Sequence, residues 1–197
     1  MSSYTTSQTL QVWPTPDPGN EIFKFAGSKV TTNVVDAQTR CPLSIAHAGQ
    51  ESVLRSADQN VFAIVTWDHA HPQVQFSWQD RAQEITDAFP VDPKTKARQM
   101  IHQGHTYLWK ISQDKRSYYL VLPSAPKQRL AYWYINDNAI FVEIKANLCE
   151  PGLLEMIFLA VLLMSNGTLR VEAEDHKTPN GLSKFATGLG LIKFLPL

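Results

Sequence analysis

The sequence lacks the features that would place it in several large classes of protein. It has only two cysteines, Cys41 and Cys149, far apart and without a partner motif, so a fold built on disulfides is not expected. We expect both thiols to be reduced and buried or half-buried, as in a cytosolic protein. The first residues, MSSYTTSQTL, contain neither the basic nor the apolar stretch of a secretory signal. The expected location is therefore the cytoplasm.

An excess of charge of either sign is also missing. The 18 Lys and Arg residues balance the 18 Asp and Glu residues, and the formal net charge is zero. Such a chain has no overall field that would attract nucleic acid or anionic lipid. Aromatic residues are frequent, as in Tyr132-Trp133-Tyr134, but few basic residues are interleaved with them. A base-stacking platform needs that interleaving, so we expect no nucleic-acid partner.

Motifs with a known chemistry are absent as well. The chain has no Gly-x-Ser-x-Gly elbow, Walker loop, dinucleotide fingerprint or calcium loop. His69 and His71 form one close pair and His102 and His105 another. A metal site needs three or four converging ligands, and nothing in the sequence brings the pairs together. We interpret them as turn histidines and predict neither a metal site nor a cofactor.

The longest apolar run is too short to cross a bilayer as a helix. Gly152 to Met164 comprises thirteen residues with Glu155 as the single charge, whereas a bilayer core needs about 20 apolar residues. Pro151 suits the first position of a helix, and Gly167 suits its end. Apolar side chains cover every face of a helix built from this run, so every face must be enclosed. The sequence predicts a buried core helix over residues 151–165.

The remainder of the chain reads as short strands separated by turns. Alternation is strict in VQFSWQD, where Val74, Phe76 and Trp78 share one face. Eleven segments fit strands, namely 21–27, 29–36, 42–48, 52–57, 60–68, 74–80, 105–112, 117–123, 129–136, 139–146 and 167–174. Many short antiparallel strands avoid exposed edges by closing on themselves. We predict a mainly β fold, a closed antiparallel barrel of about 12 strands around the helix.

The same pattern suggests three parts of the chain. Residues 1–20 include the Pro-rich stretch WPTPDPGN and are expected to form a flexible N-terminal arm. Residues 21–174 would form the barrel domain. Residues 175–197 follow as a C-terminal tail.

The predicted barrel of about twelve strands around an apolar helix near the C-terminus resembles the Tubby C-terminal-like architecture. That superfamily includes tubby, the phospholipid scramblases and the plant LURP-one-related proteins. More narrowly, the segments NVFAIVTWD, GHTYLWKIS and FVEIKANLCEPGLLEMIFLAVLLMSNG resemble a domain of unknown function common in mushroom-forming fungi. The resemblance covers about residues 20–172 and implies a barrel around a hydrophobic helix, with a leaning towards lipids. It implies no catalytic residues.

Three residues are candidates for acid–base chemistry at a barrel mouth. Glu155 is the one charge on the core helix; it either reaches water or a basic neighbour at the mouth, or acts as an acid with a raised pKa in a pocket. His105 opens a predicted strand and could serve as a general base. Asp68 stands beside the first histidine pair. For each of them a structural role is the simpler reading.

The tail NGLSKFATGLGLIKFLPL pairs basic residues with an apolar face. On a helix, Leu182, Phe185, Ala186, Leu189 and Ile192 would share one side. Lys184, Phe185, Lys193 and Phe194 are therefore candidates for weak contact with an anionic membrane surface. A tail that packs back on the barrel is the simpler reading, and a tail that forms a dimer contact is a further alternative.

These observations favour a non-enzymatic module that binds a membrane lipid or an apolar small molecule. A small-molecule enzyme with a pocket at the barrel mouth is the first alternative, because such enzymes assemble their sites from scattered residues. A protein-interaction domain is the second alternative. The oligomeric state stays open.

Overall fold

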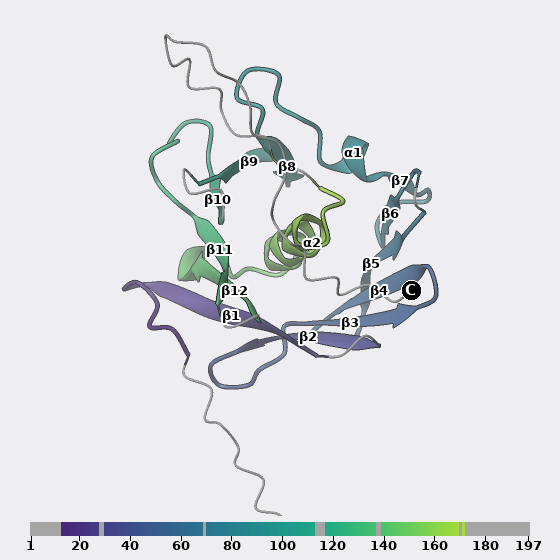
Figure 1. Ribbon diagram of the computed structural model, residues 1–197, viewed down its shortest axis with the longest axis horizontal. Coiled ribbons are helices and arrows are strands. Elements are labelled where there is room, and N and C mark those ends of the chain that lie inside the picture. Colours follow the sequence, from purple (N-terminus) through teal and green to yellow (C-terminus); the bar gives the residue numbers. More distant parts are fainter. Residues whose placement is uncertain are drawn as a thin grey trace, which may run out of the picture.

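The architecture of the protein was taken from a computed structural model, which describes residues 13–27, 30–68, 70–112, 117–136, 139–169 and 171. Twelve strands and one long helix make up this part of the chain (Figure 1). The strands are β1 (Asn20–Gly27), β2 (Thr31–Asp36), β3 (Leu43–Ala48), β4 (Glu51–Ser56), β5 (Val61–Thr66), β6 (Gln73–Phe76), β7 (Gln83–Glu84), β8 (Arg98–His102), β9 (His105–Ile111), β10 (Tyr118–Val121), β11 (Ala131–Asn136) and β12 (Ala139–Lys145). The helices are α1 (Ile85–Ala88), the 3₁₀ turn η1 (Ala146–Leu148) and α2 (Leu153–Ser165).

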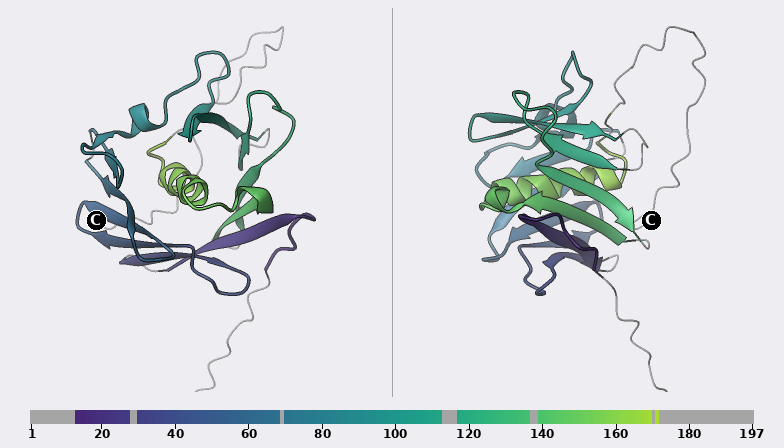
Figure 2. Two further views of the ribbon diagram at one scale, coloured as in Figure 1. Left: turned by 180° about the vertical axis from the view of Figure 1, so that it is seen from behind. Right: turned by 90° about the vertical axis from the view of Figure 1, so that its left-hand side faces the viewer.

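All twelve strands belong to one antiparallel sheet that curls around α2. The strand order is β7-β6-β5-β4-β3-β2-β1-β12-β11-β10-β9-β8. Figure 1 looks nearly along α2 and shows the strands around it, and the side view in Figure 2 shows α2 lying within the sheet. The predicted β fold around a central helix is confirmed. Within the described residues, no helix is long and apolar enough to cross a membrane.

The closure of the predicted barrel is not confirmed, because β7 and β8 are the two ends of the sheet and do not pair. Two observations explain the opening. Strand β7 has only two residues, which is too little backbone for a further ladder. The outer edge of β8 is already bonded to the chain just before it, where the Gln99 amide donates to the Pro90 carbonyl at 2.8 Å. In Figure 1, α1 and the chain after it lie between these two strands.

Ten of the predicted strands match β1 to β6 and β9 to β12, while β7 and β8 were not predicted. The sequence RQMIH of β8 does not alternate between apolar and polar residues, because the apolar residues Met100 and Ile101 are adjacent. In the structure Met100 is buried and Ile101 is 53% exposed. The predicted strand 167–174 begins in a turn and bend over residues 167–169. Most of its remaining residues lie outside the described part of the chain.

The predicted strand over residues 74–80 is shorter in the structure. Strand β6 ends at Phe76, so Trp78 does not continue the inward face of Val74 and Phe76, and it is 60% exposed. Its ring instead stacks on Phe76 with centroids 4.7 Å apart and meets the edge of Phe62 at 5.3 Å. The indole therefore covers Phe62 and Phe76, two members of the main core.

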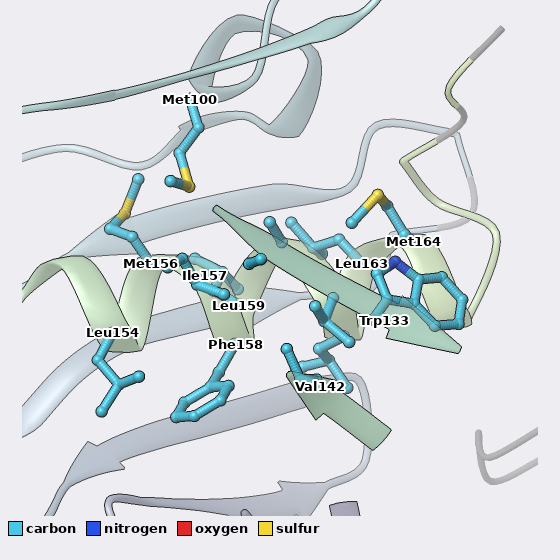
Figure 3. Close-up of a cluster of buried hydrophobic side chains, with 14 of the residues drawn as sticks. Met100, Trp133, Val142, Leu154, Met156, Ile157, Phe158, Leu159, Leu163 and Met164 are labelled. Carbon is cyan, nitrogen blue, oxygen red and sulfur yellow. The ribbon is translucent and has the colours of Figure 1, made fainter. Parts of the chain in front are cut away.

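Helix α2 is the centre of the core. Every residue from Leu153 to Met164 is buried, as expected for a helix that is apolar on all faces. Phe158 meets Phe23 and Phe25 edge-on, with centroids 5.1 and 6.1 Å apart. Figure 3 shows Met100, Trp133 and Val142 surrounding other faces of the helix.

The helix begins two residues later than predicted. Pro151 lies in the preceding turn, and Gly152 is the N-cap with a φ of 88°, which glycine adopts without a steric penalty. At the other end Gly167 has a φ of 80° and its amide donates to the Met164 carbonyl at 3.1 Å. The predicted glycine stop is thus confirmed.

Part of the predicted N-terminal arm packs on the outer face of the sheet. Trp13 meets Phe141 edge-on at 5.9 Å and contacts a small outer cluster of Ile22, Ala139 and Phe141. The Asp17 amide donates to Glu143 Oε1 at 2.7 Å. Residues 13–17 therefore lie against β1 and β12, whereas residues 1–12 lie outside the described chain.

Candidate functional site

A cavity among the described residues opens at the N-terminal end of α2. Its volume is about 360 Å³, and we call it the α2 cleft. Its lining comes from β1, the end of β2, the β2–β3 loop, the β4–β5 turn and the start of α2, namely Glu21, Phe23, Asp36, Arg40, Cys41, Pro42, Ala57, Cys149 and Leu154. The buried Phe23 and Leu154, both part of the main core, give it an apolar floor. Its charged lining residues are Glu21, Asp36 and Arg40, which we call the rim.

Asp36 builds the rim by closing the β2–β3 loop. Its carboxylate accepts hydrogen bonds from the amides of Gln38 and Arg40, at 2.9 and 2.8 Å. Its own amide donates to the Arg40 carbonyl, and its carbonyl accepts from the Thr39 amide, each at 3.0 Å. Asp36 is only 3% exposed, so a buried acceptor with several donors fixes the shape of this loop.

Arg40 is held over the cleft by three neighbours. Its Nε donates to Asp36 Oδ2, and its Nη2 donates to Gln38 Oε1 at 3.1 Å and lies 3.9 Å from Glu21 Oε2. The hydrogen bond and the charge of Asp36 raise the pKa of the guanidinium, with a smaller contribution from Glu21. The Arg40 side chain is 68% exposed, so these contacts orient the group more than they stabilise the fold.

Both cysteines of the chain line this cleft as half-buried free thiols. The pKa of Cys149 is raised to about 11, chiefly by burial, with Glu21 adding to the rise and Arg40 partly offsetting it. Burial also raises the pKa of Cys41, against a hydrogen bond from its Sγ to the Leu43 carbonyl at 3.2 Å. Because the thiolate is the nucleophile, both side chains act here as protonated, weakly polar lining.

The structure does not bring the three predicted acid–base residues together. Glu155 is 7% exposed and its Oε2 accepts from the Gly152 amide at 2.6 Å, so its partner is the helix N-terminus and not a basic side chain. His105 is exposed at the start of β9, opposite His102, whose ring lies against Gly152. Asp68 is exposed after β5, and its carboxylate accepts from the Ala70 amide at 3.0 Å.

Asp68 lies at the other end of the sheet from Glu155 and His105. Its neighbour Trp67 lines a cavity of about 30 Å³ together with Leu162 and Asn166, at the C-terminal end of α2. A single catalytic site cannot use all three residues.

The histidine pairs do not form a metal site among the described residues, which contain no group of three or more His, Cys, Asp or Glu side chains able to hold an ion. His71 Nδ1 lies 3.2 Å from Glu84 Oε1. His102 and His105 face each other across the β8–β9 hairpin. His69 lies outside the described residues.

A polar chain at the C-terminal end of α2 was not predicted. Ser52 is fully buried; its Oγ accepts from Trp67 Nε1 at 2.6 Å and lies 2.7 Å from His47 Nδ1. The other ring nitrogen of His47 lies 3.4 Å from Thr32 Oγ1. Burial lowers the pKa of His47. The sequence gives no signal for this row of hydrogen-bonded side chains, because its members come from separate segments.

The burial of His47 among these hydrogen-bonded side chains predicts how the stability of the protein depends on pH. Since the pKa of folded His47 lies below the ordinary value of about 6.5, the unfolded chain takes up the proton first as the pH falls, and unfolding is favoured. We expect the stability of the wild type to decrease between about pH 7 and about pH 5, and His47→Gln to remove part of that decrease. Urea unfolding across this range measures it. The exposed His105→Gln serves as the control, and parallel pH curves for wild type and His47→Gln would contradict the prediction.

No protein-family model matches the chain, and no curated protein matches it. Among solved structures, the chain is similar to a protein of Arabidopsis thaliana at 11% identity, over 74% of this chain and 88% of that one, with a TM-score of 0.44.

Proposed function

We propose that the protein is a non-enzymatic binding module whose ligand is an apolar small molecule or the apolar part of a membrane lipid. The observation that carries the proposal is the α2 cleft. Its volume of about 360 Å³ falls in the range of ligand pockets, about 300–1,000 Å³. An apolar floor with polar groups at the rim is the usual design of such pockets. The ligand would place its apolar part against Phe23 and Leu154.

The state of the polar groups supports binding over catalysis. General acid–base catalysis requires groups within hydrogen-bond reach of one reacting atom. Asp68 is remote from the cleft, and Glu155 is engaged by the Gly152 amide. The raised pKa values of Cys41 and Cys149 disfavour the nucleophilic thiolate. The enzyme alternative therefore gains no support from any geometry at the cleft.

The proposal also includes the superfamily relationship, the link to the fungal domain and the membrane contact that the sequence suggests. Membership of the Tubby C-terminal-like superfamily is supported by a twelve-stranded sheet around an apolar helix, and the link to the fungal domain rests on the three quoted segments. A fully closed barrel would require β7 and β8 to pair. Membrane contact through Lys184, Phe185, Lys193 and Phe194, and a cytoplasmic location, rest on sequence alone, because the tail lies outside the described residues.

The test is to fill the cleft from an exposed position. Ala57 lines the cleft from the β4–β5 turn and is exposed, so Ala57→Trp should block the cleft without disturbing the core. We expect the wild type to bind the uncharged dye N-phenylnaphthylamine saturably, with affinity at least about tenfold weaker in Ala57→Trp. Fluorescence titration measures this.

The matched control is Ala70→Trp, an exposed turn residue at the opposite end of the sheet, which should bind the dye as the wild type does. Thermal unfolding checks that both variants are folded. The proposal fails for this cleft if the wild type shows no saturable binding, or if the two variants bind alike.

A further inference from the structure

The charges at the rim of the α2 cleft restrict the head group of a ligand. Glu21 and Asp36 contribute two carboxylates and Arg40 one guanidinium. Because Asp36 is bound by the Arg40 side chain and by two amides, it is unavailable to a ligand. Glu21 is the remaining acid, and its side chain is 40% exposed. An anionic head group would enter beside that carboxylate.

The positive charge of Arg40 does not make the rim favourable to an anionic head group. Its Nε and Nη2 are engaged by Asp36, Gln38 and Glu21, so its charge is already opposed by two carboxylates. Within the described residues, Nη1 has no acceptor and Glu21 Oε1 has no donor. The rim therefore offers one donor and one acceptor, on two side chains that approach each other to 3.9 Å between Nη2 and Oε2. A hydroxyl group can accept from the first and donate to the second.

The N-terminus of α2 is not an anion site either. The positive end of a helix favours negative charge, but here the Glu155 carboxylate already accepts from the Gly152 amide at 2.6 Å. The Leu154 amide donates to the Glu150 carbonyl at 3.1 Å. The Gly152 and Leu154 amides are therefore already engaged and do not form an anion site at this end of the cleft.

Cys149 reports on the same environment. Burial and Glu21 both disfavour a negative charge on its Sγ, and the opposing effect of Arg40 is smaller, so its pKa is about 11. An anionic group placed beside this thiol would meet the same burial and the same carboxylate. A buried ammonium would also be disfavoured by burial, and Arg40 already lies near the carboxylate it would need.

From this arrangement we infer that the α2 cleft selects amphiphiles with an uncharged, hydroxyl-bearing head group and discriminates against fatty acids and other anionic lipids. The inference rests on the proposed binding function. It adds the orientation of the ligand, with its hydroxyl between Arg40 and Glu21 and its apolar chain towards Phe23 and Leu154.

The test compares three ligands of equal chain length, octanol, octanoate and octylamine, as competitors of bound N-phenylnaphthylamine on the full chain at neutral pH. Octanol should displace the dye at a concentration about tenfold lower than octanoate, and at a lower concentration than octylamine. Glu21→Gln should improve octanoate several-fold and should not improve octanol, whose hydroxyl loses a charged acceptor. Glu51→Gln, an equal change of charge at the exposed start of β4, should leave all three unchanged.

The outcomes separate this inference from the proposal beneath it. Absence of dye binding by the wild type rejects the binding function itself. Dye binding with equal or tighter competition by octanoate or octylamine, or with no competition by octanol, overturns the head-group inference alone. An equal response of the ligands to Glu21→Gln and Glu51→Gln would assign any preference to net charge and would likewise overturn it.

Discussion

Replacing Leu159 by aspartate should prevent the protein from folding. Leu159 is fully buried at the middle of α2, and α2 is enclosed by the sheet (Figure 3). Loss of the leucine alone costs about 2–5 kcal/mol, and an unpaired buried carboxylate adds several kcal/mol. The sum is comparable to the whole stability of a domain, about 5–15 kcal/mol.

The measurement is urea unfolding followed by circular dichroism, with Leu159→Met as the matched control. Methionine keeps the volume and the apolar character, so the control should cost less than about 1.5 kcal/mol. A Leu159→Asp variant that unfolds cooperatively at wild-type stability would contradict the central position of the helix.

The core helix could be predicted because two independent properties agreed. The run from Gly152 to Met164 is too short for a membrane and apolar on every face, and both properties require enclosure by protein. The strands followed from alternation, which most of them show. The strand predictions failed where the local sequence pattern does not match the strand pairing in the structure. Strand β8 exposes the apolar Ile101, and β6 ends before Trp78. At Pro151 the rule for the first helical residue gave way to the glycine N-cap that follows it.

The candidate site could not be predicted, because it forms only where the curled sheet brings separate segments together. Its walls come from segments distant in sequence, and Cys41 meets Cys149 at one cleft only because β1 and β2 lie beside the chain that enters α2. Glu155 was singled out as the one charge on the helix, but its role as the acceptor for the Gly152 amide depends on where the helix begins. Sequence patterns identify faces of elements, whereas a cleft requires the distances between them.

Asp36→Ala should destabilise the fold and weaken ligand binding together. The substitution leaves the amides of Gln38 and Arg40 without their acceptor, which costs about 1–3 kcal/mol for a buried site. It also releases the Arg40 guanidinium from its strongest partner. The donor at the rim would then lose its fixed position, and we expect the affinity for octanol to fall about fivefold or more.

Asp92→Ala is the matched control, because it opens a similar carboxylate-closed turn that does not line the α2 cleft. The Asp92 carboxylate accepts from the amides of Lys94 and Thr95 at 3.0 and 2.7 Å, and Asp92 is partly exposed. Its loss should leave octanol binding unchanged, and water can replace part of its hydrogen bonding. Urea unfolding and dye displacement on the same samples measure the two effects. If Asp36→Ala and Asp92→Ala leave octanol binding alike, Asp36 does not organise the rim, and the cleft owes its shape to the packing of Phe23 and Leu154 alone.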